Sequence, residues 1–364
     1  MAFQSLRTFT QGLCMQKNIL TVFLLLLSWV ACRKEQAQVE ISAPLPYPLE
    51  IPKGMPQMQI PADNPLTVEG VALGRKLFYD PILSGDRTQS CSSCHRQEAA
   101  FSDAGKRFSV GIKGLNGSRN AHAIINTGFL SRLFWDGRAL GLEAQILEPV
   151  PNPLEMNLSW KEAGVRLNAD ESYRKEFFQA FGINTIDSTF VAKAIAQFLR
   201  TLISADSRFD KRLRNELNLS AEELNGYVIF NTERGDCFHC HPADGGRLFT
   251  DNRFHNNGLD SVFTDKGLFS ISGNPADMGK FLTPTLRNIA FTAPYMHDGR
   301  FATLEEVIEH YNRGGIASPS TDPLMKNVGK GLNLTAKEKA DLLAFLHALS
   351  DSNFVKNKNF SSPF

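Results

Sequence analysis

The sequence lacks an excess of charge of either sign. Its 364 residues include 39 lysines and arginines against 38 aspartates and glutamates, so no basic face for nucleic-acid phosphates is expected. It also has few stretches of alternating polar and apolar residues, which are the pattern of half-buried strands. Helical patterns and loops dominate instead. We therefore expect a mainly α fold, in a chain long enough for about two domains.

No apolar run in the chain reaches the roughly 20 residues of a membrane-spanning helix. The run at positions 19–30 follows Lys17 and ends just before Cys32, an arrangement typical of a signal peptide. We expect a signal peptide over residues 1–31, with the true start at Met1 or Met15, and export to the periplasm or cell envelope. Cys32 resembles the lipid-anchored cysteine of a bacterial lipoprotein; cleavage elsewhere, without a lipid anchor, is the alternative.

Cysteine is scarce outside two short motifs. Of the six cysteines only Cys14 and Cys32 lie elsewhere; the others form Cys91-Ser-Ser-Cys94-His95 and Cys237-Phe-His-Cys240-His241. In a C-x-x-C-H motif the two thiols bind a heme covalently and the histidine binds its iron. We therefore expect two c-type hemes, with His95 and His241 as axial ligands. The alternative is a redox or zinc C-x-x-C motif followed by a histidine by chance. The occurrence of two complete C-x-x-C-H motifs in one exported chain argues against this alternative.

Proline marks a tether before the globular body. Six prolines between positions 44 and 61 disfavour helix and favour extended backbone, so residues 32–62 are predicted to be a tether.

Specific signals predict several helices in the body. A Ser or Thr followed three residues later by Glu forms a capping box, and this pattern begins at Ser220, Thr303 and Thr335. A further helix is predicted from four apolar residues with the spacing of one helix face: Val68, Ala72, Leu73 and Leu77.

The two halves of the body repeat one order of motifs. The segment 136–146 aligns without gaps to 298–308, and both begin Asp-Gly-Arg. An Arg-Asn pair precedes each segment, at Asn120 and at Asn288, and a heme motif precedes each pair. This repeat indicates duplication of one unit. We expect two tandem cytochrome c-like domains, at residues 63–210 and 211–364, each with one covalent heme.

Four segments carry a resemblance to a known family. They are Phe-Trp-Asp-Gly-Arg-Ala (134–139), Asn-Pro-Leu-Glu-Met (152–156), Thr-Pro-Thr-Leu-Arg-Asn-Ile (283–289) and Thr-Ala-Pro-Tyr-Met-His-Asp-Gly-Arg (292–300). In these segments the chain resembles the bacterial diheme cytochrome c peroxidases, a family that includes the methylamine-utilisation enzyme MauG. The resemblance covers about residues 64–350.

The resemblance implies a division of labour between the hemes. In the family the N-terminal heme reacts with hydrogen peroxide and the C-terminal heme relays electrons from a small donor such as a cytochrome c or a cupredoxin. The family's distal acid–base carboxylate corresponds to Glu155, and its inter-heme tryptophan to Trp135. An exposed glutamate and a core tryptophan are the plain structural alternatives.

The resemblance also implies a calcium ion between the domains. Its protein ligands correspond to the side chain of Asn120 and the carbonyls of Thr292 and Pro294, and oxygen ligands of this kind suit a hard cation. Family members often form homodimers, and the sequence shows no surface patch that decides this point.

Two departures concern the sixth ligand of each iron. The histidine that blocks the N-terminal heme in many family members has no counterpart near Ile112, so we expect that heme to be open. At the C-terminal heme, the position of the common methionine ligand corresponds to Tyr311, as in MauG. A phenolate there should lower the reduction potential relative to a methionine. Met296 and Met278 are the nearest alternatives, and a core tyrosine is the structural one.

Three functions follow from these features. The first is a diheme peroxidase that reduces hydrogen peroxide. The second is a MauG-like oxidase of a protein or organic substrate, which the open heme and Tyr311 favour. The third is an electron carrier without enzyme activity, which requires both irons to be closed by two ligands.

Overall fold

The three predicted capping boxes are present, and each begins a helix. The computed structural model describes residues 43–103, 105–243 and 247–364. In it, Ser220 caps α8 (Ala221–Phe230), Thr303 caps α10 (Leu304–Asn312) and Thr335 caps α11 (Ala336–Ala348). Each cap hydroxyl accepts from the N–H of the glutamate three residues on, whose side chain accepts from the cap N–H. These bonds satisfy donors that the first helical turn leaves open.

The fold is mainly α, as predicted. The other α-helices of the described residues are α2 (Val68–Tyr79), α3 (Leu142–Ile146), α4 (Trp160–Ala169), α5 (Glu171–Phe181), α6 (Ser188–Thr201), α7 (Arg208–Leu213) and α9 (Phe269–Ser272). Short 3₁₀ helices lie at Pro81–Leu83, Cys91–Ser93, Gln97–Ala99, Thr127–Phe129, Pro275–Asp277, Ile289–Phe291 and Phe354–Lys356. Strands within the described residues are limited to two antiparallel pairs, β1 (Arg132–Leu133) with β2 (Ala139–Leu140) and β3 (Phe254–His255) with β4 (Phe281–Leu282).

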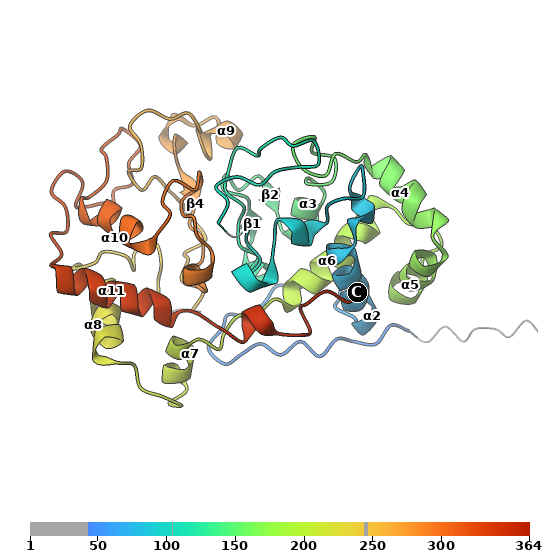
Figure 1. Ribbon diagram of the computed structural model, residues 1–364, viewed down its shortest axis with the longest axis horizontal. Helices are drawn as coiled ribbons and strands as arrows, with labels where there is room; N and C mark the ends of the chain where they lie inside the picture. The colour runs from blue at the N-terminus through green and yellow to red at the C-terminus, as the bar shows by residue number, and fades with distance from the viewer. Residues whose placement is uncertain (1–42, 104, 244–246) are drawn as a thin grey trace, which may run out of the picture. The chain divides into compact units, whose positions relative to one another are not determined.

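One type of close helix contact occurs in both halves. Helix α2 packs on α6, and α8 packs on α11, a crossing that Figure 1 shows. A Cβ atom on Gly74 in α2 would overlap the carbonyl oxygen of Ala194 in α6. In the same way, a Cβ on Gly226 in α8 would overlap the carbonyl oxygen of Asp341 in α11. The internal repeat seen in the motifs therefore extends to the packing of the helices.

The helix predicted from Val68, Ala72, Leu73 and Leu77 is confirmed as α2, but only two of these four residues are buried. Leu73 and Leu77 are buried, but Val68 is 41% exposed and Ala72 is exposed. The contact with α6 runs along the glycine side of the helix, at Gly74, because only a residue without a side chain allows that approach. This contact turns Val68 and Ala72 toward solvent.

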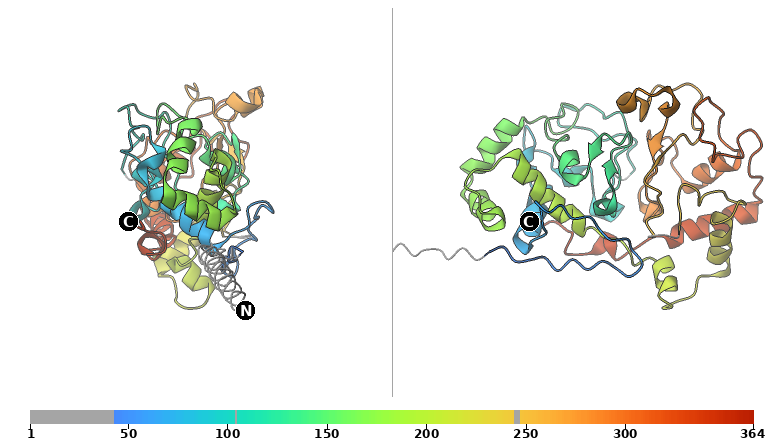
Figure 2. Two further views of the ribbon diagram at one scale, coloured as in Figure 1. Left: turned by 90° about the vertical axis from the view of Figure 1, so that its right-hand side faces the viewer. Right: turned by 180° about the vertical axis from the view of Figure 1, so that it is seen from behind.

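Buried side chains form two cores. The first gathers apolar residues of α2, α4, α5 and α6, and the second those of α7, α8, α10 and α11. The C-terminal segment after α11 returns to the first core, where Phe354 and Phe360 pack. Figures 1 and 2 show this segment running from α11 to α2, where Arg75 donates to the carbonyl of Ser361 at 2.7 Å. The domain boundaries at 63–210 and 211–364 stay a prediction.

The described part of the predicted tether, residues 43–62, contains no helix and lies against the body. Met58 is buried, and its side chain lies at Gly128. Arg247 donates to the carbonyl of Lys53 at 3.1 Å. The signal peptide, Cys32 and the first part of the tether lie outside the described residues. Among the residues that are described, no helix combines the length and apolarity that crossing a bilayer requires.

The glycine contact predicts a stability effect. Gly74→Ala should lower the free energy of unfolding by about 1–3 kcal/mol, because the added methyl group forces α2 away from α6. Denaturant-induced unfolding of the mature protein measures this. The matched control is Gly164→Ala in α4, where the nearest atom to an added Cβ is 3.5 Å away. This control should be neutral or stabilising by about 0.4–1 kcal/mol; equal destabilisation by both changes would contradict the account.

Candidate functional site

The first motif presents two thiols and one imidazole nitrogen to a cavity. Nδ1 of His95 lies 2.9 Å from the carbonyl oxygen of Phe101. A carbonyl only accepts, so Nδ1 carries the proton and Nε2 is the nitrogen left to bind a metal. Burial raises the pKa of Cys91 to about 12 and also raises that of Cys94.

The second motif repeats this arrangement. Nδ1 of His241 lies 2.9 Å from the carbonyl oxygen of Phe249, which again leaves Nε2 as the free nitrogen. Burial raises the pKa of Cys237 to about 12. The four motif cysteines form no disulfide.

Both motifs line one cavity of about 1130 Å³. That volume exceeds the roughly 300–1,000 Å³ of a usual small-ligand pocket. Two free thiols, an imidazole with its Nδ1 already engaged and a large cavity beside them are what a covalently bound heme requires. The residues therefore fit two hemes, one at each motif.

Glu155 lies in this cavity and is held on both its side chain and its backbone. Nδ2 of Asn152 donates to Oε1 of Glu155 at 2.6 Å, and the N–H of Ile112 donates to the Glu155 carbonyl at 3.0 Å. Burial raises the pKa of the carboxyl group, and the bond from Asn152 opposes this rise. A carboxyl group with a raised pKa can exchange protons closer to neutral pH.

The loop at Ile112 packs against Glu155 without supplying a histidine. Ser109, Val110 and Gly111 line the cavity. A Cβ on Gly111 would overlap the carbonyl oxygen of Leu154, so the two segments touch backbone to backbone. None of these three cavity-lining residues carries an imidazole. The open first heme stays a prediction, and this loop is compatible with it.

Trp135 lines the cavity that both motifs share and is only 9% exposed. Its indole Nε1–H donates to the carbonyl of Asn120 at 2.9 Å. The carbonyl of Trp135 accepts from the N–H of Leu282 in β4 at 2.8 Å. Arg119 adds ion pairs to Asp136 and Asp265, both at 2.6 Å. These contacts join the loop before β2 to the second half of the chain.

Three further aromatic rings lie near Trp135. The ring of His122 lies 4.1 Å from Trp135, centroid to centroid, at an angle of 31°. His297 meets Trp135 edge-on at 6.5 Å and stacks on Phe281 at 3.7 Å. Burial lowers the pKa of His122 to about 3, so its ring is neutral. Sequence reasoning missed His297 and Phe281, because only the fold brings them to Trp135.

Tyr311 lies on α10 and lines the cavity at the second motif. Burial raises the pKa of its phenol to about 12. Nδ2 of Asn257 donates to its hydroxyl oxygen at 3.1 Å, and the same nitrogen lies 3.5 Å from Sδ of Met296. Met296 and also Met325 line the cavity, whereas Met278 is not among its lining residues. The ligand role of Tyr311 stays a prediction, with Met296 as the alternative that the cavity retains.

The three predicted calcium ligands line the same cavity. Asn120, Thr292 and Pro294 all line it. Nδ2 of Asn120 donates to the carbonyls of Lys106 and Arg107, at 3.1 and 3.2 Å, so its side-chain oxygen is left to accept or to bind. An amide oxygen and two carbonyls fit a hard cation. Calcium stays a prediction.

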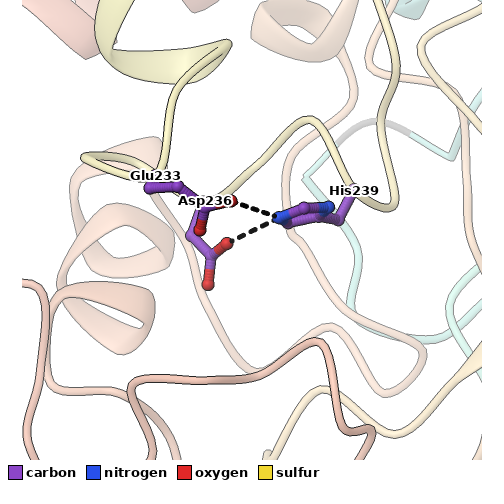
Figure 3. A group of neighbouring side chains, drawn as sticks. All are labelled: Glu233, Asp236 and His239. Carbon is purple, nitrogen blue, oxygen red and sulfur yellow. Dashed lines mark hydrogen bonds and ion pairs between the residues drawn. The ribbon is translucent and has the colours of Figure 1, made fainter.

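A cluster of two carboxylates and a histidine at the second motif is bound by a lysine. Figure 3 shows that Glu233 and Asp236 both face Nε2 of His239, at 3.2 and 3.3 Å. The ammonium of Lys326 bonds to Glu233 at 2.9 Å and to His239 at 3.0 Å. The lysine ammonium takes the position that a metal cation would need. We therefore interpret the cluster as a network of charged surface side chains.

Comparison with known proteins gives a consistent family. A model of the family described as "Di-haem cytochrome c peroxidase" matches residues 68–218. Cytochrome-c peroxidase IdrP1 of Denitromonas iodatirespirans is 36% identical over 330 residues, which cover 81% of this chain and 85% of that protein. Methylamine utilization protein MauG of Methylophilus methylotrophus is 35% identical over 310 residues, covering 85% of this chain and 90% of that protein.

Solved structures agree on the fold. A crystal structure described as a MauG-like protein associated with microbial copper homeostasis is 40% identical, with a TM-score of 0.81. The match covers 87% of this chain and 99% of that one. The diheme peroxidase BthA of Burkholderia thailandensis, at 23% identity and a TM-score of 0.69, has a similar fold. Its match covers 88% of this chain and 99% of that one.

The geometry of the motifs predicts the heme content. Wild-type protein, produced in a host that matures c-type cytochromes, should carry the mass of two hemes. Changing Cys237 and Cys240 to alanine should leave one, because that heme loses both its thioether bonds; changing Cys91 and Cys94 should also leave one. Intact-protein mass spectrometry measures this. Two covalent hemes in either double variant would contradict the assignment.

Proposed function

Because the chain belongs to the di-haem cytochrome c peroxidase family, which includes MauG, we propose that it reduces hydrogen peroxide to water with electrons from a small redox donor. The di-haem family implies two c-type hemes. We place one on Cys91, Cys94 and His95 and the other on Cys237, Cys240 and His241. The observation that carries the proposal is the half-buried carboxyl group of Glu155, which lines the cavity of the first motif.

Glu155 is proposed to move the proton on which cleavage of the O–O bond depends. A heme held by Cys91, Cys94 and His95 would supply the iron that binds peroxide and the electrons that reduce it. The carboxylate of Glu155 takes a proton from the bound peroxide and returns it to the oxygen that leaves as water. Asn152 orients the carboxylate through Oε1, and the N–H of Ile112 fixes its backbone. Each peroxide consumes two electrons and two protons and yields two waters.

Trp135 is proposed to couple the two sites. Its indole lines the cavity that both motifs share. Hydrogen bonds hold both the indole N–H and the backbone carbonyl of Trp135. Tyr311 is proposed to hold the second heme together with His241, and a heme held by two residues would suit electron transfer better than substrate binding. The donor would be a small cytochrome c, a cupredoxin or a similar protein outside the cytoplasm, where the predicted signal peptide directs the chain. A calcium ion at Asn120, Thr292 and Pro294 would stabilise the same region.

A MauG-like oxidase is the second candidate, and the ring stack favours it. His297 and Phe281 line the cavity that both motifs share. They also line a separate hollow of about 150 Å³, together with Arg107 and Asp260. A protein or organic substrate bound outside could lose electrons through these rings. Peroxide consumption without any added cytochrome or cupredoxin, but with oxidation of a partner, would favour this function.

Removal of the carboxyl group tests the proposed acid–base role. Glu155→Gln should lower the rate of peroxide consumption by about 10²–10⁴-fold, because an amide cannot accept the proton. Steady-state rates of the diheme protein with a reduced cytochrome measure this. Glu171→Gln, on the exposed start of α5, is the control and should keep the wild-type rate. An unchanged rate in Glu155→Gln would refute the role of Glu155.

The bond from Asn152 predicts a change in pH dependence. An N–H that donates to a carboxylate favours the charged form and lowers its pKa. Asn152→Ala removes this bond, so the pKa of Glu155 should rise further. Because the base must be deprotonated to act, the acid limb of the rate profile should move to higher pH, by roughly 0.5–1 unit for a typical hydrogen bond. A limb that stays in place or moves to lower pH would contradict this reading.

A further inference from the structure

One amide contacts both candidate sixth ligands at the second motif. Nδ2 of Asn257 lies 3.1 Å from the hydroxyl oxygen of Tyr311 and 3.5 Å from Sδ of Met296. All three side chains line the cavity. An amide carries two N–H donors, so it can serve both acceptors at once. A hydroxyl oxygen is the stronger acceptor of the two, because a thioether sulfur accepts only weakly.

The backbone of Asn257 is fixed by the helix that carries Tyr311. Nε2 of His310, the neighbour of Tyr311 on α10, lies 3.2 Å from the carbonyl oxygen of Asn257. The N–H of Ile316, beyond the end of α10, donates to the carbonyl of Gly258 at 2.7 Å. The amide and the phenol are therefore held in register by bonds between their two segments.

The two residues before Asn257 are fixed as well. His255 is held by carboxylates on both ring nitrogens, with Nδ1 at 2.6 Å from Asp322 and Nε2 at 2.8 Å from Asp251. Asn256 is 1% exposed and donates to the hydroxyls of Ser318 and Ser320 at 3.2 and 3.0 Å. Such a network leaves the loop little freedom, so the position of the Asn257 amide is built into the fold.

We propose that Asn257 is a positioning residue that selects Tyr311, rather than Met296, as the sixth ligand of the heme at the second motif. One N–H of the amide orients the phenol oxygen toward the cavity, and the other keeps the sulfur of Met296 turned to the loop. The inference rests on the proposed diheme function and adds to it the device that makes the second site differ from a methionine-ligated one.

Two substitutions remove the donors in different ways. Asn257→Leu removes all polarity, and Asn257→Asp keeps the shape of the side chain while an ionised carboxylate can only accept. In the diheme protein, both should lose the spectrum of a tyrosine-ligated heme, measured by electron paramagnetic resonance and visible absorption. The reduction potential of that heme should rise if Met296 takes the position, because methionine ligation raises it.

The methionine variants identify the replacing ligand. Met296→Leu alone should keep the wild-type spectrum. Added to Asn257→Leu, it should abolish the rise in potential; a rise that persists assigns the new ligand to another residue, such as Met325, and overturns the part of the inference that concerns Met296. Intact mass confirms that each variant holds two hemes, and Asn257→Asp keeps the test valid if Asn257→Leu does not mature.

Tyr311→Phe separates failure of this inference from failure of the proposed ligation. If Tyr311→Phe changes the spectrum while both Asn257 variants keep it, Tyr311 is a ligand but Asn257 does not select it. If Tyr311→Phe leaves the spectrum unchanged, the proposed ligation itself is wrong, and the inference falls with it.

Discussion

The hydrogen bond from the indole of Trp135 to the carbonyl of Asn120 is the contact on which the shared site depends. It fixes the orientation of the indole ring. The bond from the N–H of Leu282 to the backbone carbonyl of Trp135 attaches the same residue to the second half of the chain. Arg119 reinforces this junction by pairing with Asp136 on one side and Asp265 on the other. Because these bonds hold, both motifs and the Trp135 ring line one cavity. A loose junction would leave two separate cytochrome-like units without a defined route between them.

The two halves of the chain share a common plan, and the side chains that line the cavity differ between them. Both halves tie Nδ1 of the motif histidine to a backbone carbonyl, and both pack two helices through a glycine. At the first motif the cavity receives the carboxyl group of Glu155 and a loop without histidine. At the second it receives the phenol of Tyr311, held by Asn257. A carboxyl group suits proton transfer to a bound substrate, whereas a phenol can close the iron.

Local sequence signals predicted the parts of the structure that depend on few residues. The capping boxes at Ser220, Thr303 and Thr335 and the two C-x-x-C-H motifs belong to this class, since each rests on residues close in the chain. The apolar residues of α2 did not show which side of the helix is buried. The close packing of Gly74 on the carbonyl of Ala194 in α6 decides it. The stack of His297 on Phe281 and the position of Asn257 join segments distant in sequence, so no local pattern could reveal them. Sequence alone also left Met278 and Met296 equal, and only the fold brings Met296 to the cavity.

We propose that the two motifs hold unequal irons, one open and one closed. The most direct test is an electron paramagnetic resonance spectrum of the fully oxidised diheme protein without peroxide. We expect one high-spin ferric signal, from the site of His95 and Glu155, and one low-spin ferric signal, from the site of His241 and Tyr311. Two low-spin signals would contradict an open first site and would favour an electron carrier. Two high-spin signals would contradict the closure of the second site.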